Sequence, residues 1–288
     1  MKVYMFHYVK TNSNYYHYDL KQFEKTIKYL KENYKVISLK QFDELKKENK
    51  IIPDDYIMLT FDDGTIDHYK NVYPILLKYN CSGLFFIPSC IFNNKVLDVQ
   101  IIHQLLENNS IDILMNDLIS ELSDENNDIL NKEKIDNNNS ESIFKQLLQY
   151  KLPKDIRYKI LHYLSTKYKV SLIVEDNYIN LYDLKVMKEN NMFFGIHTNT
   201  HPRLGLLSKS EQVLEIEENM NLLIENGLID ENLCSIAFPF GSFNDETLEI
   251  MQEKKIKYGF KVNEEGIESD LLINRIDCNQ LKNMIIKE

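Results

Sequence analysis

Short apolar runs alternate with amphipathic segments along most of the chain. The continuous apolar runs 56–61 and 84–87 are typical of strands buried on both faces, whereas 20–30, 72–79 and 213–223 repeat apolar residues at helical spacing. Further strands are expected near 3–8, 36–37, 192–196, 236–238, 258–260 and 272–273, and further helices near 39–45, 184–187 and 248–251. Seven or eight strands that alternate with helices predict a β/α barrel rather than an open sheet.

The alternation is interrupted between residues 91 and 178. This segment has a helical pattern, and its centre is the Asn- and Asp-rich tract 126–139. Polar tracts of this kind rarely pack, so we expect a mobile middle. We therefore interpret residues 1–288 as one barrel domain with a helical insertion at about 91–178. A lid, a dimer contact and a filler remain alternatives for the insertion, and the oligomeric state is left open.

Composition narrows the function classes. With 43% hydrophobic residues the chain is globular, and its net charge of −10 argues against nucleic acid and anionic membranes as partners. No apolar stretch approaches the 18 residues of a transmembrane segment, and the first strand begins at once without a leader, which predicts a cytoplasmic protein. The four cysteines are scattered, with no C-x-x-C pair, so we expect buried, reduced thiols.

Three polar clusters directly follow expected strands. They are Asp62-Asp63-Gly64, the segment from His197 to His201, and Pro239-Phe240-Gly241; His7 lies similarly near the end of the first strand. The carboxyl ends of barrel strands converge on one mouth, so these residues are expected to meet. Each cluster alone is a weak signal, because Asp-Asp-Gly is commonly a turn and two histidines four apart could lie on an exposed helix.

Together the clusters supply one carboxylate and two imidazoles for a metal, with a second carboxylate to spare. Asp63, His197 and His201 form a ligand set suited to Zn²⁺ or a similar divalent ion. Asp62 would then be available as a base in metal-assisted hydrolysis. The chain has no G-x-G-x-x-G, P-loop or G-x-S-x-G motif, so nucleotide-binding loops and serine esterase chemistry have no local signature.

These motifs resemble those of the polysaccharide deacetylases of carbohydrate esterase family 4. The resemblance covers about residues 1–90 and 178–277, and it rests on Thr60-Phe61-Asp62-Asp63-Gly64, Ile75-Leu76 to Phe85-Phe86, His197-Thr198-x-x-His201-Pro202 and Pro239-Phe240-Gly241. It implies a distorted (β/α)7 barrel that removes an acetyl group from an N-acetylated carbohydrate.

The resemblance also implies a role for each motif residue. Asp62 would be the general base, while Asp63, His197 and His201 would hold Zn²⁺, with Co²⁺, Ni²⁺, Fe²⁺ or Mn²⁺ as alternatives. The backbone N–H of Phe240 would donate to the oxyanion of the tetrahedral intermediate.

The chain departs from the family pattern at two places. Ala237 occupies the position of the usual arginine that orients the base; Arg275 is a candidate replacement, the alternative being a surface arginine paired with Asp277. No histidine follows His201, whereas many members use a C-terminal histidine as general acid. Members with a shifted strand order resemble this chain in carrying a histidine on the first strand, so His7 is the expected acid, against the alternative of a packed histidine.

Several other interpretations stay open at this stage. For His68, a helix-capping or solvated role is expected rather than a catalytic one.

For the function of the protein, the alternatives are O-deacetylation or hydrolysis of another amide, a carbohydrate-binding protein that keeps its metal, and an interaction protein with a vestigial site. The missing leader favours a small or lipid-linked glycan over finished cell wall as substrate.

Overall fold

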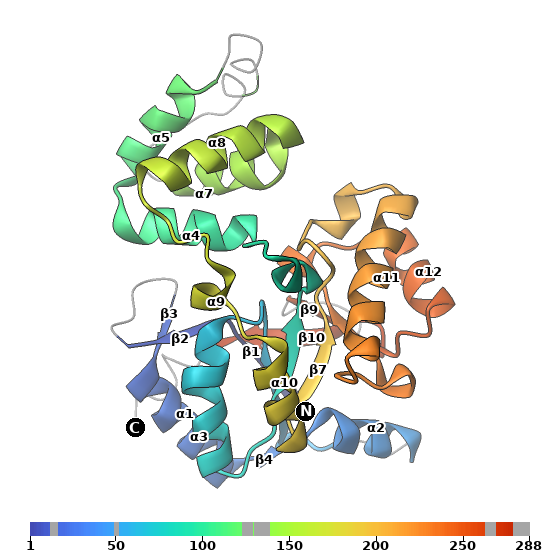
Figure 1. Ribbon diagram of the computed structural model, residues 1–288. Helices are drawn as coiled ribbons and strands as arrows, with labels where there is room; N and C mark the ends of the chain where they lie inside the picture. The colour runs from blue at the N-terminus through green and yellow to red at the C-terminus, as the bar shows by residue number, and fades with distance from the viewer. Residues whose placement is uncertain (12–16, 49–51, 123–128, 130–138, 263–268, 279–288) are drawn as a thin grey trace. The chain divides into compact units, whose positions relative to one another are not determined.

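A computed structural model describes residues 1–11, 17–48, 52–122, 129, 139–262 and 269–278. The chain divides into two compact units, one made of Met1–Asn93 with Tyr178–Glu288 and the other of Asn94–Asn177 (Figure 1). The first unit contains every β-strand of the described residues, and the second is helical.

The first unit is a closed barrel of seven parallel strands. Each strand pairs with the next in the following order, and the last pairs again with the first: β1 (Lys2–Phe6), β10 (Ile273–Asp277), β9 (Tyr258–Val262), β8 (Ser235–Ala237), β7 (Phe193–Ile196), β6 (Leu84–Ile87) and β5 (Tyr56–Phe61). Strand β4 (Lys35–Val36) pairs with the first residues of β5, outside the ring. The predicted distorted (β/α)7 barrel is confirmed.

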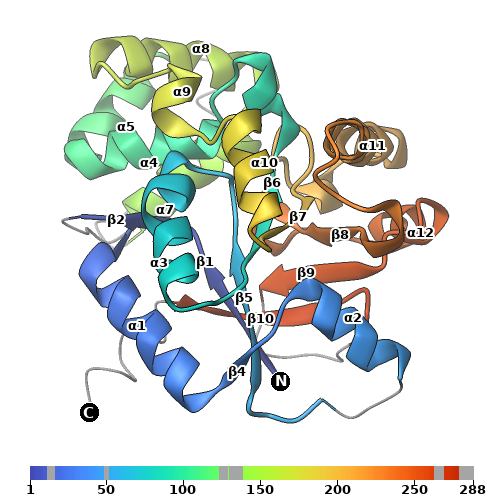
Figure 2. The same cartoon turned by 60° about the horizontal axis from the view of Figure 1, so that its bottom comes forward.

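Helices connect and surround these strands (Figure 2). They are α1 (Leu20–Asn33), α2 (Leu39–Lys47), the π-helix η1 (His68–Val72), α3 (Tyr73–Lys78), α10 (Leu181–Glu189), α11 (Lys209–Glu225) and α12 (Asp245–Glu253). Short 3₁₀ helices lie at η2 (Ser89–Asn93), η4 (Leu204–Leu206), η5 (Glu231–Leu233) and η6 (Pro239–Gly241). Ser38, Ser208 and Asn244 each begin a helix with a capping box, which satisfies backbone N–H groups that have no partner inside the helix.

The barrel packs as the apolar runs predict. Phe61 stacks between Phe6 and Phe85, with ring centroids 5.3 and 4.7 Å away, and all three rings are fully buried. Gly195 on β7 makes room for Phe86, because a Cβ atom there would lie 2.6 Å from the Phe86 ring. The four cysteines are buried, as expected.

One pairing was not expected from the sequence. Strands β2 (Tyr8–Lys10) and β3 (His17–Asp19) form a separate two-stranded parallel sheet. Each has three residues, too few for a periodic pattern to be detected. The first apolar run is therefore two strands, separated at His7, rather than one.

The second unit consists of helices around a leucine- and isoleucine-rich core. They are α4 (Asp98–Asn108), α5 (Ile111–Ser120), α7 (Ser140–Gln146), the π-helix η3 (Leu147–Lys151), α8 (Lys154–Lys167) and α9 (Val174–Asn177). Most of the Asn-rich tract 126–139, where a mobile middle was expected, lies outside the described residues. The interpretation of this segment as an insertion into a single domain stays a prediction. Within the described part of the chain, no helix has the length and apolar character needed to cross a bilayer.

Candidate active site

The Asp62–Asp63 pair lies directly after β5, at the carboxyl end of the barrel strands. The Asp62 amide donates to the Phe6 carbonyl at 3.0 Å, which extends the pairing of β5 with β1 by one residue. Asp63 and Gly64 then both have left-handed backbone conformations, with φ of 75° and 63°. Non-glycine residues rarely adopt this conformation, and here it accompanies a sharp turn after which the two neighbouring carboxylates meet different partners.

The loop after β7 brings both histidines to the site. His197 and His201 are buried, and positive φ values at Thr198 and His201 show that the segment is not a regular helix, as expected. The His201 amide donates to the Thr198 hydroxyl at 3.0 Å. His197 Nδ1 donates to the Ala237 carbonyl at 2.8 Å, so Nε2 of this ring keeps its lone pair for a metal.

Helix α11 holds this loop through side chains that the sequence analysis missed. Asn219 accepts from the His197 amide at 2.8 Å and donates to the Ile87 carbonyl at 2.9 Å, which joins the ends of β7 and β6. Glu215 accepts from the Thr200 amide at 2.7 Å and from its hydroxyl at 2.5 Å. The buried residues of α11 are Gln212, Ile216, Asn219 and Leu223. Polar residues that recur at the spacing of a buried helical stripe were the available signal.

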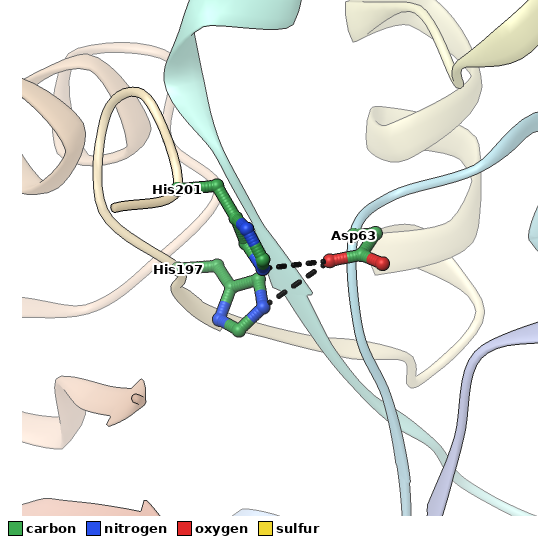
Figure 3. Close-up of side chains that lie close together, drawn as sticks. All are labelled: Asp63, His197 and His201. Carbon is green, nitrogen blue, oxygen red and sulfur yellow. Dashed lines mark ion pairs between the residues drawn. The ribbon is translucent and has the colours of Figure 1, made fainter. Parts of the chain in front are cut away.

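Asp63, His197 and His201 converge on one point (Figure 3). Asp63 Oδ1 lies 3.3 Å from His197 Nε2 and 3.2 Å from His201 Nε2, and the three potential ligand atoms lie within 4.8 Å of one another. Two ligand atoms bound tetrahedrally to Zn²⁺ at about 2.0–2.1 Å are separated by about 3.3 Å. Asp63 Oδ1 is buried without a hydrogen-bond partner, so the carboxylate, the imidazoles and their spacing all fit a divalent ion.

The charges within this triad are strongly coupled. Burial raises the pKa of Asp63, but the nearby imidazoles of His201 and His197 outweigh it and hold that pKa well below its usual value. Burial lowers the pKa of both histidines; the Asp63 and Asp62 carboxylates reverse this for His197, whose pKa is raised, but not for His201, whose pKa is lowered. The carboxylate is therefore ionised at neutral pH, which suits metal binding.

Asp62 faces a different partner, the guanidinium of Arg275 on β10. Two parallel hydrogen bonds of 2.7 Å join Arg275 Nη1 and Nη2 to Asp62 Oδ1 and Oδ2. Arg275 is 1% exposed, so the alternative of a surface arginine is wrong. Burial raises the pKa of Asp62, and the Arg275 charge outweighs burial, so the pKa is lowered overall. Ala237, at the usual arginine position, contributes only its carbonyl to His197.

His7 lies at the junction of β1 and β2, beside the same carboxylate. Its Nε2 is 3.9 Å from Asp62 Oδ2, and its side chain is 38% exposed. The imidazole is therefore close to the base and still reachable from solvent. The structure thus brings together the expected base and the expected acid; their catalytic roles stay predictions.

The third motif lies beside the metal ligands. Phe240, within η6, has a φ of 57°, and its ring meets the His201 ring edge-on at 4.7 Å between centroids. The Arg203 guanidinium lies 4.6 Å from the Phe240 ring. The motif is thus next to the site, while the role of the Phe240 N–H at the oxyanion stays a prediction.

The expectation for His68 is wrong. This residue neither caps a helix nor faces solvent: it is fully buried, and its Nε2 donates to the His7 carbonyl at 2.6 Å. The polar sequence around it, Asp67-His68-Tyr69, gave no indication of burial. The apolar spacing predicted a single amphipathic helix here, and such a pattern does not reveal a π-helical turn.

The fold and the site define a β/α-barrel protein with a candidate divalent-metal centre at its strand ends. Residues 49–135 and 137–259 match the sequence model of the polysaccharide deacetylase family, and the chain belongs to this family. The resemblance to carbohydrate esterase family 4 is confirmed, and members of that family are carbohydrate deacetylases.

Individual relatives agree with this assignment. The chain is 23% identical over 259 residues to the poly-beta-1,6-N-acetyl-D-glucosamine N-deacetylase of Staphylococcus aureus (strain MSSA476), an alignment that covers 88% of this chain and 65% of the relative. The deacetylase PplD of Streptococcus pyogenes, solved with acetate, superimposes with a TM-score of 0.60 at 21% identity, covering 96% of this chain and 91% of that one. IcaB from Ammonifex degensii gives a TM-score of 0.59 at 14% identity and coverages of 99% and 96%.

Proposed function

We propose that this protein is a metal-dependent deacetylase that hydrolyses the acetamide of an N-acetylated sugar, releasing acetate and a free amino sugar. The proposal is supported by the family and by the staphylococcal relative, whose name specifies an N-acetylglucosamine polymer. A polymer or oligosaccharide of N-acetylglucosamine is therefore the first substrate to test.

Four residues beside the metal ligands have roles in this reaction. Asp62 accepts a proton from the water that attacks the acetyl carbon, and Arg275 keeps Asp62 ionised and oriented. The Phe240 N–H donates to the oxygen that becomes negatively charged. His7, partly exposed and 3.9 Å from Asp62, protonates the nitrogen as the C–N bond breaks.

Asp63, His197 and His201 hold the divalent ion. When bound, Zn²⁺, or Co²⁺, Ni²⁺, Fe²⁺ or Mn²⁺ in its place, acidifies water and polarises the acetyl carbonyl. The protein's part is to orient the ligands: the Ala237 carbonyl orients the His197 ring, and Asn219 anchors the His197 backbone.

The observation that carries the proposal is the separation of two adjacent carboxylates. Asp63 meets the two imidazoles, while Asp62 meets Arg275 and lies near His7. A protein that only bound a metal would need Asp63 but not a second buried carboxylate held ionised beside it. Such a carboxylate is what a general base requires, so we favour catalysis over the binding-only alternative.

The test is acetate release from N-acetylglucosamine oligosaccharides with β-1,6 and β-1,4 linkages, measured together with metal content. We expect activity that is lost on chelation and restored by Zn²⁺ or Co²⁺. Asp62→Asn should lower the rate at least about a hundredfold and leave metal content unchanged. Unchanged acetate release from Asp62→Asn would refute the base assignment, and release only from O-acetylated sugars would favour the esterase alternative. The cytoplasmic location stays a prediction.

A further inference from the structure

Three side chains, one just before the π-helix η1 and two within it, hold the backbone of His7–Val9. The Asp67 carboxylate accepts from the Val9 amide at 2.6 Å, and the Asn71 amide group donates to the Val9 carbonyl at 2.7 Å. His68 Nε2 donates to the carbonyl of His7 itself at 2.6 Å. We call this set, Asp67, His68 and Asn71, the β2 clamp.

The clamp acts where the chain leaves the barrel. The hydrogen bond from the Asp62 amide to the Phe6 carbonyl extends the β1–β5 pairing to its end, and β2 then pairs with β3 in a separate sheet. Backbone groups between two sheets must find other partners, and here side chains supply them. The position of His7 therefore depends on η1 as well as on the barrel.

The imidazole of His68 is buried at a cost in free energy. It is fully buried, and its ring centroid lies 5.7 Å from those of Phe61 and Phe85. A polar ring among phenyl rings is destabilising where its nitrogens lack partners, and Nδ1 of this ring is buried without a hydrogen bond among the described residues. A third phenyl ring would pack here without that cost. Because a carbonyl oxygen only accepts, Nε2 must carry the proton, and the ring is a dedicated donor to His7.

The form of the helix is consistent with this role. Helix η1 has π geometry over His68–Val72 before α3 continues at Tyr73, and it packs against β2. Single π-helical turns inside α-helices are uncommon and are frequently found at functional sites.

We propose that His68, supported by Asp67 and Asn71, is a positioning residue that sets the place of the His7 imidazole beside Asp62. The proposal rests on the proposed function, in which His7 protonates the leaving amine. His68 itself touches no reacting atom, and its effect reaches the substrate through the backbone of His7.

The first test is His68→Phe, which keeps an aromatic ring and removes the donor. We expect kcat to fall at least tenfold while KM and metal content change less than twofold. His68→Gln, whose amide nitrogen can again donate, should recover most of kcat. Val72→Ala, a buried change in the same π-helix without a bond to His7, should lower stability but not kcat. If His68→Phe fails to fold, Asn71→Leu removes a second arm of the clamp and should act in the same direction.

A double-mutant cycle with His7→Ala separates positioning from general damage to the fold. If His68 acts through His7, His68→Phe should cause no further loss in the His7→Ala background. Crystal structures should also show the His7–Asp62 separation of 3.9 Å widened in His68→Phe. Multiplying losses, or an unmoved His7, would overturn the inference. A displaced His7 together with a fully active His7→Ala would instead refute the general-acid role and leave the positioning role standing.

Discussion

Arg275 and Asp62 are 213 residues apart in the sequence and form a buried, bidentate ion pair with two 2.7 Å hydrogen bonds. The pair links the two strands on either side of β1, since Asp62 follows β5 and Arg275 lies on β10. Arg275 also donates to the Thr60 hydroxyl at 3.3 Å. Together these bonds hold the base candidate in one orientation.

Replacing Arg275 by Met should damage both stability and activity. Removal of one partner from a buried ion pair leaves an uncompensated charge and costs about 3–5 kcal/mol of unfolding free energy. Without the guanidinium, burial dominates and the pKa of Asp62 rises, so the acid limb of the rate profile should move to higher pH. Urea unfolding and a pH–rate profile measure the two effects. An unshifted acid limb would show that Arg275 does not keep the base ionised.

Loss of the metal should lower thermal stability. A ligand that binds only the folded state at 100 times its Kd adds about 2.7 kcal/mol, so chelation should lower Tm and added Zn²⁺ should restore it. His201→Ala should abolish both the metal content and this Zn²⁺-dependent shift. The exposed His162 provides a matched control, and His162→Ala should behave as the wild type does. An equal Zn²⁺ response from both variants would place the ion elsewhere.

Asn219→Leu should weaken metal binding without touching a ligand. The substitution keeps the approximate volume but removes the acceptor for the His197 amide and the donor for the Ile87 carbonyl. We expect a destabilisation of about 1–3 kcal/mol per unsatisfied buried group and a 10–100-fold loss of metal affinity, measured by unfolding and by competition with a chelator. Asn221→Leu, an exposed change on the same helix, is the control. Wild-type affinity in Asn219→Leu would contradict the support role.

Asp43→Asn should reveal a pH-dependent contribution to stability at the opposite end of the barrel strands from the site. Burial raises the pKa of Asp43, but hydrogen bonds from Lys257, Lys47 and Tyr258 outweigh it and lower the pKa below 3.8. The stabilisation is therefore fully present above pH 3.8 and is lost as the pH falls through the lower folded-state pKa. Asp43→Asn should cost about 1–3 kcal/mol at pH 7 and progressively less below pH 4, by urea unfolding. A loss of unfolding free energy in Asp43→Asn that stays the same from pH 7 to pH 3 would contradict this contribution.

Local pattern was sufficient to predict most of the barrel. Residues 56–61 and 84–87 are strands with the expected bounds, because a strand buried on both faces reads as an unbroken apolar run. The polar motifs that end such runs were equally visible, and parallel strands force their carboxyl ends to one side. Convergence of Asp63 with His197 and His201 therefore follows from topology.

Only the tertiary structure decided which distant side chains pair with one another. The sequence left open whether Arg275 pairs with Asp62 or with Asp277. It predicted a capping or solvated role for His68 and gave no role to Asn219. Each of these outcomes depends on which groups of other elements come within hydrogen-bonding distance, and the periodicity of a single segment does not specify those groups. The sequence by itself thus determined most of the barrel strands, the polar motifs at their ends and the family, because each of these is encoded within a few consecutive residues. Packing decided which groups hold the base, the histidine loop and His7 in place, because hydrogen bonds across elements form only once backbone positions are set.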